Sequence, residues 1–205
     1  MKHVIISISR QYGSGGRIVA QKLAEALGVP CYDKGLIENV AKETGLTEDY
    51  IKQTENRPTG SFLFDLCSGY GFNYGIPQAM PLPDRVFVEQ CKVIKKAAQD
   101  GPCVIVGRCA DHVLDDRADC LRVFVSAPLD ERVKRAQETY GDEADNMENF
   151  VVKRDKSRAS YYNHFVGKKW GERSNYDLCV DTRIGIDAAV EVIRAAAEAL
   201  DSKNN

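Results

Sequence analysis

Short apolar runs alternate with amphipathic stretches along this chain of 205 residues. The apolar runs are rich in β-branched side chains and are not interrupted at every second position, which is typical of strands buried on both faces of a sheet. We expect five such strands, at 4–8, 29–32, 103–106, 121–125 and 176–181. They alternate with stretches of helical periodicity, so the pattern predicts an α/β fold with a parallel sheet covered by helices on both faces.

The first strand leads into a glycine-rich turn. After that turn, Val19, Leu23 and Leu27 recur at intervals of four and so share one face of a helix. A glycine turn between a strand and a helix lets main-chain N–H groups point at an anion, and the helix N-terminus adds partial positive charge. A plain tight turn in an α/β protein would use the same glycines. We expect a phosphate-binding loop formed by Gly13, Ser14, Gly15, Gly16 and Arg17.

This turn matches the phosphate-loop pattern G-x-x-x-x-G-K-[ST] only in part. If Gly15 takes the second glycine position, Gly16 stands at the lysine position and Arg17 at the hydroxyl position. If Gly16 takes the second glycine position, Arg17 replaces the lysine and Ile18 replaces the hydroxyl. In neither register does the loop carry its usual lysine.

Two further parts of the pattern are missing. The first glycine is replaced by Arg10 or Gln11, depending on the register. No serine or threonine follows the loop in the position that ligates Mg²⁺, and the nearest hydroxyls are those of Ser9 and Ser14. The sequence therefore assigns no metal ligand from the protein, with Ser14 kept as the one candidate.

The composition argues against several classes of protein. A formal net charge of −2 gives no strong attraction to nucleic acid or to an anionic membrane. No apolar run approaches the length of a membrane span, and the chain begins in a strand rather than a signal peptide. The seven cysteines contain no C-x-x-C pair, so we expect reduced core thiols and no zinc site. We expect a cytoplasmic protein with no nucleic-acid or membrane partner.

Residues 57–83 differ in character from the rest of the chain. They combine several prolines and glycines with five aromatic residues, which fits an ordered excursion better than a linker. One interpretation is a loop packed on its own aromatic side chains. The other is a flap that covers a substrate or contacts a second subunit, and the sequence leaves homo-oligomerisation open.

Charged and glycine residues follow several of the expected strands. They are the segment 9–17, Asp33 and the pair Gly107-Arg108. Ligands of parallel α/β sheets bind beyond the carboxyl ends of the strands, so these positions predict a nucleotide site there.

Four segments, in this order, resemble motifs of the cytidylate kinase-like family: Gly13-Ser14-Gly15, Tyr32-Asp33-Lys34-Gly35, Gly107-Arg108-Cys109 and Arg154-Asp155-Lys156-Ser157-Arg158-Ala159. The resemblance implies a three-layer P-loop NTPase fold with a five-stranded parallel sheet in the order 2-3-1-4-5 and a small helical lid. It also implies a single domain over residues 1–205, with a monophosphate-binding lobe at about 33–100 and the lid at about 140–170.

The resemblance implies roles for the matching residues, and arginine suits them because its planar cationic fork fits phosphate oxygens. It implies that Asp155 accepts a hydrogen bond from the exocyclic amino group of cytosine. Without it, residues 154–158 would be interpreted as a solvated helix face with weak ion pairs. We interpret Glu131, Arg132 and Arg135 as a solvated face, with the alternative that an arginine there approaches the lid. The candidate catalytic residues are Arg17, Arg108, Arg154 and Arg158, and the candidate acceptor-binding residues are Asp33, Lys34, Arg108, Asp155 and Arg158. The resemblance implies these roles at the positions that match the motifs, and Arg17 and Lys34 are added as cations at positions that depart from them.

Three departures from the family pattern fall on functional positions. Lys34 replaces a serine or threonine, Asn39 replaces an arginine and Cys109 replaces an aspartate. Together with the absent loop lysine, they bear on the chemistry, because one cation at the transferred phosphoryl group contributes factors of about 10³–10⁵ in related enzymes. Arg17 and Lys34 are the candidate replacements.

The leading hypothesis is a phosphotransferase that uses ATP with Mg²⁺ and a nucleoside monophosphate acceptor, CMP or dCMP by default. Two alternatives stay open at this point. One is a non-catalytic nucleotide-binding protein with a degenerate loop, and the other is a kinase of a non-nucleotide small molecule.

Overall fold

The structure, a computed structural model, describes residues 4–33 and 81–203. The helices expected at 34–55, most of the segment 57–83, Lys34 and Asn39 lie outside the described residues. In chain order the elements are β1 (Ile5–Arg10), α1 (Gly16–Leu27), β2 (Cys31–Tyr32), α5 (Leu82–Asp100), β3 (Cys103–Val106), α6 (Ala110–Val113), β4 (Cys120–Ser126), α7 (Leu129–Glu138), α8 (Met147–Val166), η1 (Arg173–Asn175), β5 (Leu178–Asp181), η2 (Thr182–Ile184) and α9 (Ile186–Lys203).

The five strands form one parallel sheet in the order β2-β3-β1-β4-β5, which confirms the predicted topology. β1 lies at the centre, where Ile5 is in register with Cys103 of β3 and with Cys120 of β4. All five strands point the same way, so their carboxyl ends meet at one edge of the sheet. The turn after β1 therefore lies in the middle of that edge.

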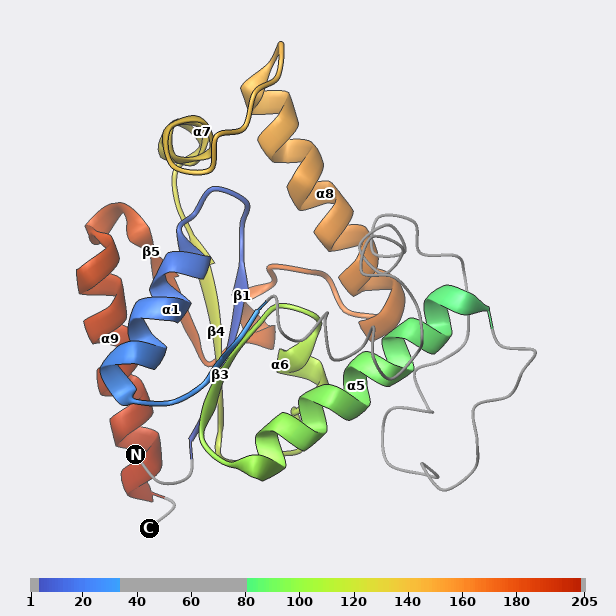
Figure 1. Ribbon diagram of the computed structural model, residues 1–205, viewed down its shortest axis with the longest axis vertical. Helices are drawn as coiled ribbons and strands as arrows, with labels where there is room; N and C mark the ends of the chain where they lie inside the picture. The colour runs from blue at the N-terminus through green and yellow to red at the C-terminus, as the bar shows by residue number, and fades with distance from the viewer. Residues whose placement is uncertain (1–3, 34–80, 204–205) are drawn as a thin grey trace.

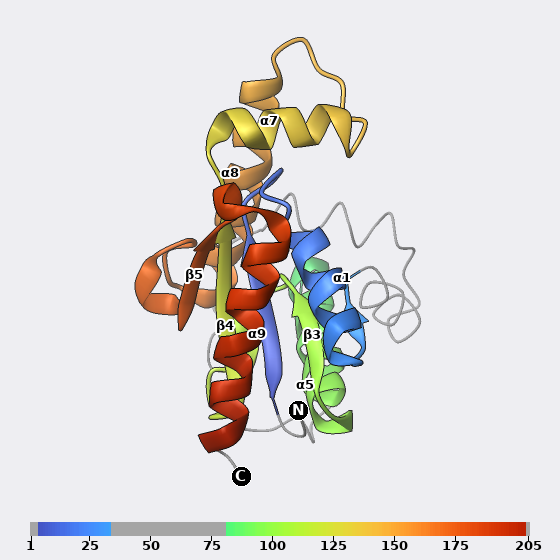
Figure 2. The ribbon, with the colours of Figure 1, turned by 90° about the vertical axis from the view of Figure 1, so that its left-hand side faces the viewer.

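Helices cover both faces of the sheet because the strands are apolar on both sides. Ile5 and Ile105 face a core formed with α5, α6 and α8. Ile6 and Ile8 face the opposite core, formed with α1 and α9. Figures 1 and 2 show α1 and α9 packed along one face and α5 and α6 along the other. Each face thus buries alternate residues of the same strands, as a three-layer α/β fold requires.

The ends of the helices follow local signals, with one correction. Gly28 closes α1 in a left-handed conformation (φ 65°), and the Asn146 side chain caps α8 by accepting the N–H of Asn149 at 2.8 Å. The prediction that Asp84 caps the long helix is wrong, because α5 already begins at Leu82, after Pro81. Asp84 instead lies in the first turn, where a carboxylate suits the helix dipole.

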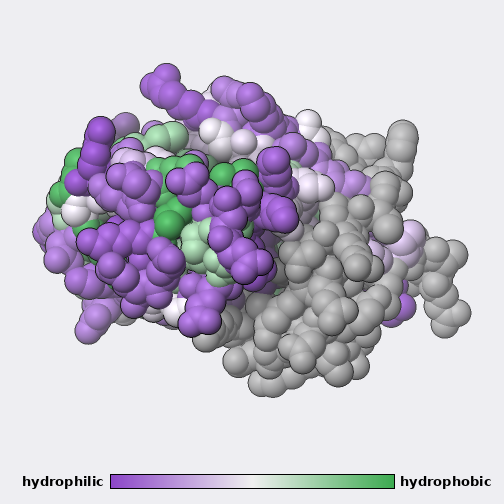
Figure 3. Space-filling model, turned by 90° about the horizontal axis from the view of Figure 1, so that it is seen from above, coloured by the Kyte–Doolittle hydropathy of each residue, from purple (hydrophilic) through white to green (hydrophobic). Residues whose placement is uncertain are grey.

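α7 and the first half of α8 stand above the carboxyl edge of the sheet (Figure 1). They pack on one another through a small apolar cluster of Ala136, Met147 and Val151. Seen from above, this end of the molecule shows mainly hydrophilic side chains with a few hydrophobic ones between them (Figure 3). Among the described residues, no helix combines the length and apolarity needed to span a membrane.

Candidate functional site

The loop between β1 and α1 has the geometry of an anion cradle. Gly13 and Gly15 both adopt positive φ, at 75° and 80°, and Gly15 precedes the first residue of α1 without any side-chain cap. The helix thus presents its first N–H groups and the positive end of its dipole toward the loop. A Cβ on Gly13 would overlap the carbonyl oxygen of Arg132, so glycine is required there by close approach as well as by backbone conformation.

The Ser14 hydroxyl holds the loop together from within. It donates to the carbonyl of Gln11 at 2.9 Å and accepts the N–H of Gly16 at 3.3 Å. Thr182, the first residue after β5, donates to the Ser14 carbonyl at 2.7 Å. Ser14 is fully buried, so in this conformation its oxygen faces the loop and not a ligand.

The described residues do not fit a Mg²⁺ ion held by the protein. Ser14, the candidate ligand from the sequence, is used inside the loop, and the side chain at the hydroxyl position is Arg17, a cation. No group of three or more His, Cys, Asp or Glu side chains within residues 4–33 and 81–203 is placed to bind a metal. Any Mg²⁺ at this site would arrive with the phosphate groups of a nucleotide and keep most of its water ligands.

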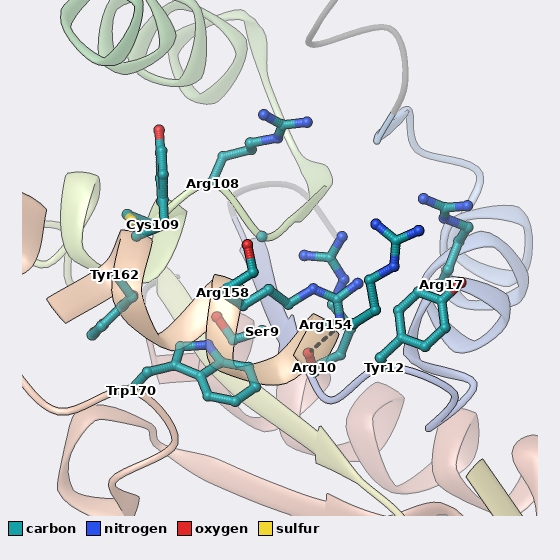
Figure 4. Close-up of a pocket in the computed structure, with 13 residues that line it drawn as sticks. Ser9, Arg10, Tyr12, Arg17, Arg108, Cys109, Arg154, Arg158, Tyr162 and Trp170 are labelled. Atoms are coloured by element: carbon teal, nitrogen blue, oxygen red, sulfur yellow. Dashed lines mark hydrogen bonds between the residues drawn. The ribbon is translucent and has the colours of Figure 1, made fainter. Parts of the chain in front are cut away.

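A cavity of about 340 Å³ lies beside the loop, and arginines from several elements line it (Figure 4). Arg10 comes from the end of β1, Arg17 from α1 and Arg108 from the turn after β3. α8 adds Arg154 and Arg158. Aromatic and small residues complete its wall: Ser9, Tyr12, Gly107, Cys109, Ser157, Tyr161, Tyr162 and Trp170. Five guanidinium groups around one cavity favour a ligand with phosphate groups.

A second cavity, of about 270 Å³, lies within the cradle itself. Gly13 and Gly16 form part of its wall, together with Tyr140 and Asp142 from beyond α7. The two cavities have four lining residues in common, which are Arg10, Tyr12, Arg17 and Arg158. These four residues therefore mark the border between a pocket on the loop and a pocket over the sheet edge.

Three of these arginines are held as cations in surroundings that disfavour charge. Burial lowers the pKa of Arg158 to about 9, and the nearby Arg10 lowers it further while Asp155 opposes the change. Burial likewise lowers the pKa of Arg108 to about 10 and lowers that of Arg10. A bound anion would stabilise these guanidinium groups and so offset the cost of removing them from water. The electrostatics of the site therefore favour the binding of phosphate.

The turn that carries Arg108 has an unusual backbone. Gly107, Arg108 and Cys109 adopt φ of 73°, 61° and 58° in succession, although only the first is glycine. Non-glycine residues in this region cost about 1–3 kcal/mol each and persist where the surrounding structure imposes them. Here the strain sits at the carboxyl end of β3 and places Arg108 and Cys109 in the cavity wall. Cys109 is almost fully buried, so its thiol occupies the position where the family motif has an aspartate.

Tyr12 connects the loop to α8 and to the segment that precedes α8. The Tyr12 hydroxyl donates to Asp142 at 2.6 Å, and its N–H donates to Asp155 at 2.7 Å. The guanidinium of Arg158 lies 5.2 Å from the centre of the Tyr12 ring, and that of Arg154 lies 5.8 Å from it. Burial and the Asp142 carboxylate raise the pKa of Tyr12 to about 12, so this hydroxyl stays a donor over the physiological range.

α7 also binds the loop, contrary to expectation. Arg132 is buried, forms an ion pair with Asp155 and donates to the Tyr12 carbonyl at 3.3 Å. Arg135 donates to the Gly13 carbonyl at 2.6 Å. The interpretation of Arg132 and Arg135 as a solvated face is therefore wrong, whereas the ion pair of Arg132 with Asp155 on α8 fits the alternative that an arginine of this group approaches residues 140–170. Both arginines thus satisfy carbonyl groups of the loop.

The structure gathers most of the site residues named from the sequence. Arg17, Arg108, Arg154 and Arg158 all line the larger cavity, and Gly13 and Gly16 line the smaller one. Asp33 instead forms an ion pair with Arg17, with 2.6 Å between Oδ2 and Nε.

Asp155 is not among the residues that line the larger cavity. Its two oxygens meet the Tyr12 N–H and the guanidinium of Arg132, so here it connects α8 to the loop and to α7. Its contact with a cytosine amino group stays a prediction. Lys34, also named for the acceptor, lies outside the described residues.

The sequence analysis included Arg10 in the segment 9–17 predicted to lie at the site but gave this residue no role of its own. Arg10 lines both cavities from the end of the central strand. A motif search registers it only as a missing glycine, although a cation at that position is itself a signal for anion binding.

Comparison with known proteins gives consistent matches over nearly the whole chain. Residues 5–184 match the sequence pattern of the cytidylate kinase-like family. A cytidylate kinase of Methanopyrus kandleri is 25% identical over 208 residues, which cover 96% of this chain and 94% of that protein. A cytidylate kinase of Thermococcus kodakarensis is 28% identical over 200 residues, which cover 96% of this chain and 89% of that protein.

Solved structures share the fold. An uncharacterised protein from Eubacterium ventriosum has a TM-score of 0.71 at 28% identity, covering 96% of this chain and 99% of that one. A gluconokinase from Sinorhizobium meliloti has a TM-score of 0.57 at 15% identity, covering 98% and 94%. A shikimate kinase from Bacteroides thetaiotaomicron has a TM-score of 0.54 at 15% identity, covering 95% and 98%. At such low identity the last two establish a common fold alone.

Proposed function

This chain belongs to the cytidylate kinase-like family, and from that premise we propose that it is an ATP-dependent nucleotide kinase with CMP or dCMP as its default acceptor. The observation that carries the proposal is the convergence of five arginines on a cavity that adjoins the glycine loop. The relatives named cytidylate kinases support the choice of acceptor.

In the reaction proposed, an oxygen of the acceptor's phosphate attacks the γ-phosphorus of ATP. The bond between that phosphorus and the bridging oxygen breaks, and its electron pair leaves with ADP. The acceptor becomes a nucleoside diphosphate, and no covalent enzyme intermediate forms. The protein acts by positioning the two reactants and by stabilising the negative charge on the transferred group.

The two cavities divide this work. The donor's terminal phosphates would lie in the smaller cavity, against the main-chain N–H groups near Gly13 and Gly16. The acceptor would lie in the larger cavity, where Arg108 and Arg154 reach its phosphate. Arg17 and Arg158 line both cavities and so would contact the group in transfer. Tyr12 ties this border to the lid, which would exclude water that could otherwise hydrolyse ATP.

One feature favours the alternative of a nucleotide-binding protein without catalysis. Gly16 opens α1 at a position where phosphate loops carry lysine, and the Arg17 guanidinium is already paired with Asp33. A kinase of a non-nucleotide small molecule is the third hypothesis, and it shares the donor site. All three hypotheses therefore predict ATP binding, and they differ in whether ATP is consumed with a nucleoside monophosphate as acceptor.

A panel of acceptors separates these hypotheses. Purified protein is mixed with ATP and Mg²⁺ and with CMP, dCMP, UMP or AMP, and ADP release is followed. The proposal predicts turnover with CMP or dCMP well above the rate without acceptor. Thermal stabilisation by ATP without turnover on any member would reject it and favour the two alternatives.

The variant Arg108→Ala tests the division of the site. Arg108 lines the larger cavity and is not among the residues that line the smaller one, so its loss should weaken acceptor binding at least tenfold more than ATP binding. Arg194→Ala is the control, because Arg194 is half-exposed on α9 and pairs with Glu191 and Glu198. Equal weakening of both ligands by Arg108→Ala would contradict the assignment.

A further inference from the structure

The site lacks the lysine of a phosphate loop but has an additional arginine. Gly16 is the first residue of α1, and Arg10 is the last residue of β1. Arg10 lines both cavities, at their common border. Figure 4 shows it beside Arg154 and Arg158, with Arg17 on the other side of Tyr12.

Arg10 and a side chain at position 16 compete for the same space. A Cβ placed on Gly16 would lie 2.6 Å from the Cβ of Arg10 and 3.1 Å from its Cγ. The stem of Arg10 therefore fills the volume into which a lysine at position 16 would begin to extend. Since Gly16 does not adopt a positive φ, its glycine is explained by this contact and not by backbone conformation.

A second glycine makes room for the charged end of the same side chain. A Cβ on Gly107 would overlap Nη1 of Arg10. Gly16 at the start of α1 and Gly107 directly after β3 thus accommodate the stem and the guanidinium of Arg10. The side chain is built into the site, in contrast to Arg17, whose side chain is 48% exposed.

Within the described part of the chain, the Arg10 guanidinium forms no ion pair. Among residues 4–33 and 81–203, no carboxylate lies within ion-pair distance of it, and Asp33, which attracts it from farther away, is paired with Arg17. Arg17 and Arg158 both lie close enough for mutual repulsion with Arg10. A partly buried cation among other cations at the border of two cavities calls for an anionic ligand at that border.

We propose that Arg10 is the phosphate-binding cation of this site, and that it replaces the lysine which Gly16 cannot supply. On the proposed function, on which this inference rests, its guanidinium contacts the phosphoryl group that passes from donor to acceptor. The cation reaches the cradle from the end of β1 and not from the start of α1. Because their side chains would occupy the same space, Arg10 and a lysine at position 16 exclude each other.

An exchange of the two positions tests this directly. Arg10→Gly removes the cation, and we expect at least a tenfold loss of ATP affinity in calorimetry and at least a hundredfold loss of kcat. Gly16→Lys alone places a lysine against the Arg10 stem and should also be inactive. The double variant Arg10→Gly/Gly16→Lys restores a lysine in the vacated space and should recover at least tenfold over Arg10→Gly. Arg194→Ala controls for the loss of an arginine elsewhere.

The outcomes are distinct. ATP affinity and kcat of Arg10→Gly within threefold of the unaltered protein would overturn the proposal. A folded double variant that is no better than Arg10→Gly would also overturn it, because Arg10 would then act through structure alone. If the double variant does not fold, Arg10→Lys decides: partial retention of ATP affinity compared with Arg10→Gln supports the proposal, and equal loss overturns it. Should the unaltered protein turn over no acceptor, the proposed function fails while the ATP-binding comparison still tests Arg10.

Discussion

Replacing Arg158 by glutamine should make the free protein more stable and its phosphate site weaker. The pKa of Arg158 is lowered from 12.5 to about 9 by burial and by the charge of Arg10. One pKa unit corresponds to about 1.4 kcal/mol, so holding this side chain as a cation costs up to about 5 kcal/mol. Its side chain keeps 28% exposure, and solvent screening reduces that figure to about 2–4 kcal/mol.

The substitution also removes favourable contacts. Arg158 donates to the Arg10 carbonyl at 3.3 Å and lies over the Tyr12 ring, and together these contribute about 1–2 kcal/mol. Asp155 keeps the Tyr12 N–H and Arg132 as partners, so no carboxylate is left alone. The net expectation is a gain of about 1–2 kcal/mol, which for a domain of this size raises Tm by about 2–8 °C.

The assay is thermal unfolding of both proteins, with and without pyrophosphate as an anionic probe. We expect Arg158→Gln to melt higher when free and to gain much less from pyrophosphate. The lowered pKa destabilises the fold fully below about pH 9, and this cost is relieved as the pH rises from about 9 toward 12.5. The advantage of Arg158→Gln should therefore be constant between pH 6 and 8 and shrink above about pH 9. A free Arg158→Gln protein less stable than its parent would refute the reasoning.

Three further predictions follow from other contacts. Gly13→Ala should destabilise the protein by more than about 2 kcal/mol in urea unfolding, because its Cβ would overlap the Arg132 carbonyl at positive φ; an effect below 0.5 kcal/mol would contradict the close approach. Tyr12→Phe should cost about 1 kcal/mol and speed amide exchange in 139–146, since the hydrogen bond to Asp142 is lost while the ring stays; unchanged exchange would contradict a role of this hydrogen bond in holding the segment. Burial raises the pKa of Asp111, so Asp111→Asn should stabilise the protein at pH 7, and the gain should vanish below about pH 4, where the carboxyl is neutral in both states; a pH-independent difference in Tm would contradict this.

The sheet could be predicted from sequence because its strands are almost purely apolar. A run such as 103–106 has no polar residue to place on a solvent face, so it must lie inside a parallel sheet. The strand order came from the resemblance, since local pattern alone does not fix which strands are neighbours. Helix starts were less secure, because Pro81 allowed α5 to begin two residues before the acidic residue chosen as its cap.

Those parts of the site were predicted whose role can be inferred from the residue type and its place after a strand. The glycines of the loop and Arg108 at a strand end carry their signal locally. Arg132 did not, because a charged residue on a polar helix face is buried only when a second element arrives, here the loop at Tyr12. The proposed phosphate-binding role of Arg10 could not be predicted for another reason. It depends on the contacts of Arg10 with Gly16 and Gly107, which come together only in the folded protein.

The most direct test of the central claim follows the phosphoryl group itself. The protein is incubated with Mg²⁺, ATP labelled at the γ-phosphate and CMP, and the products are separated. The account predicts label in CDP at a rate that falls at least a hundredfold in Arg10→Gly and is unchanged in Arg194→Ala. Label that stays in ATP, or that appears only as inorganic phosphate, would contradict it.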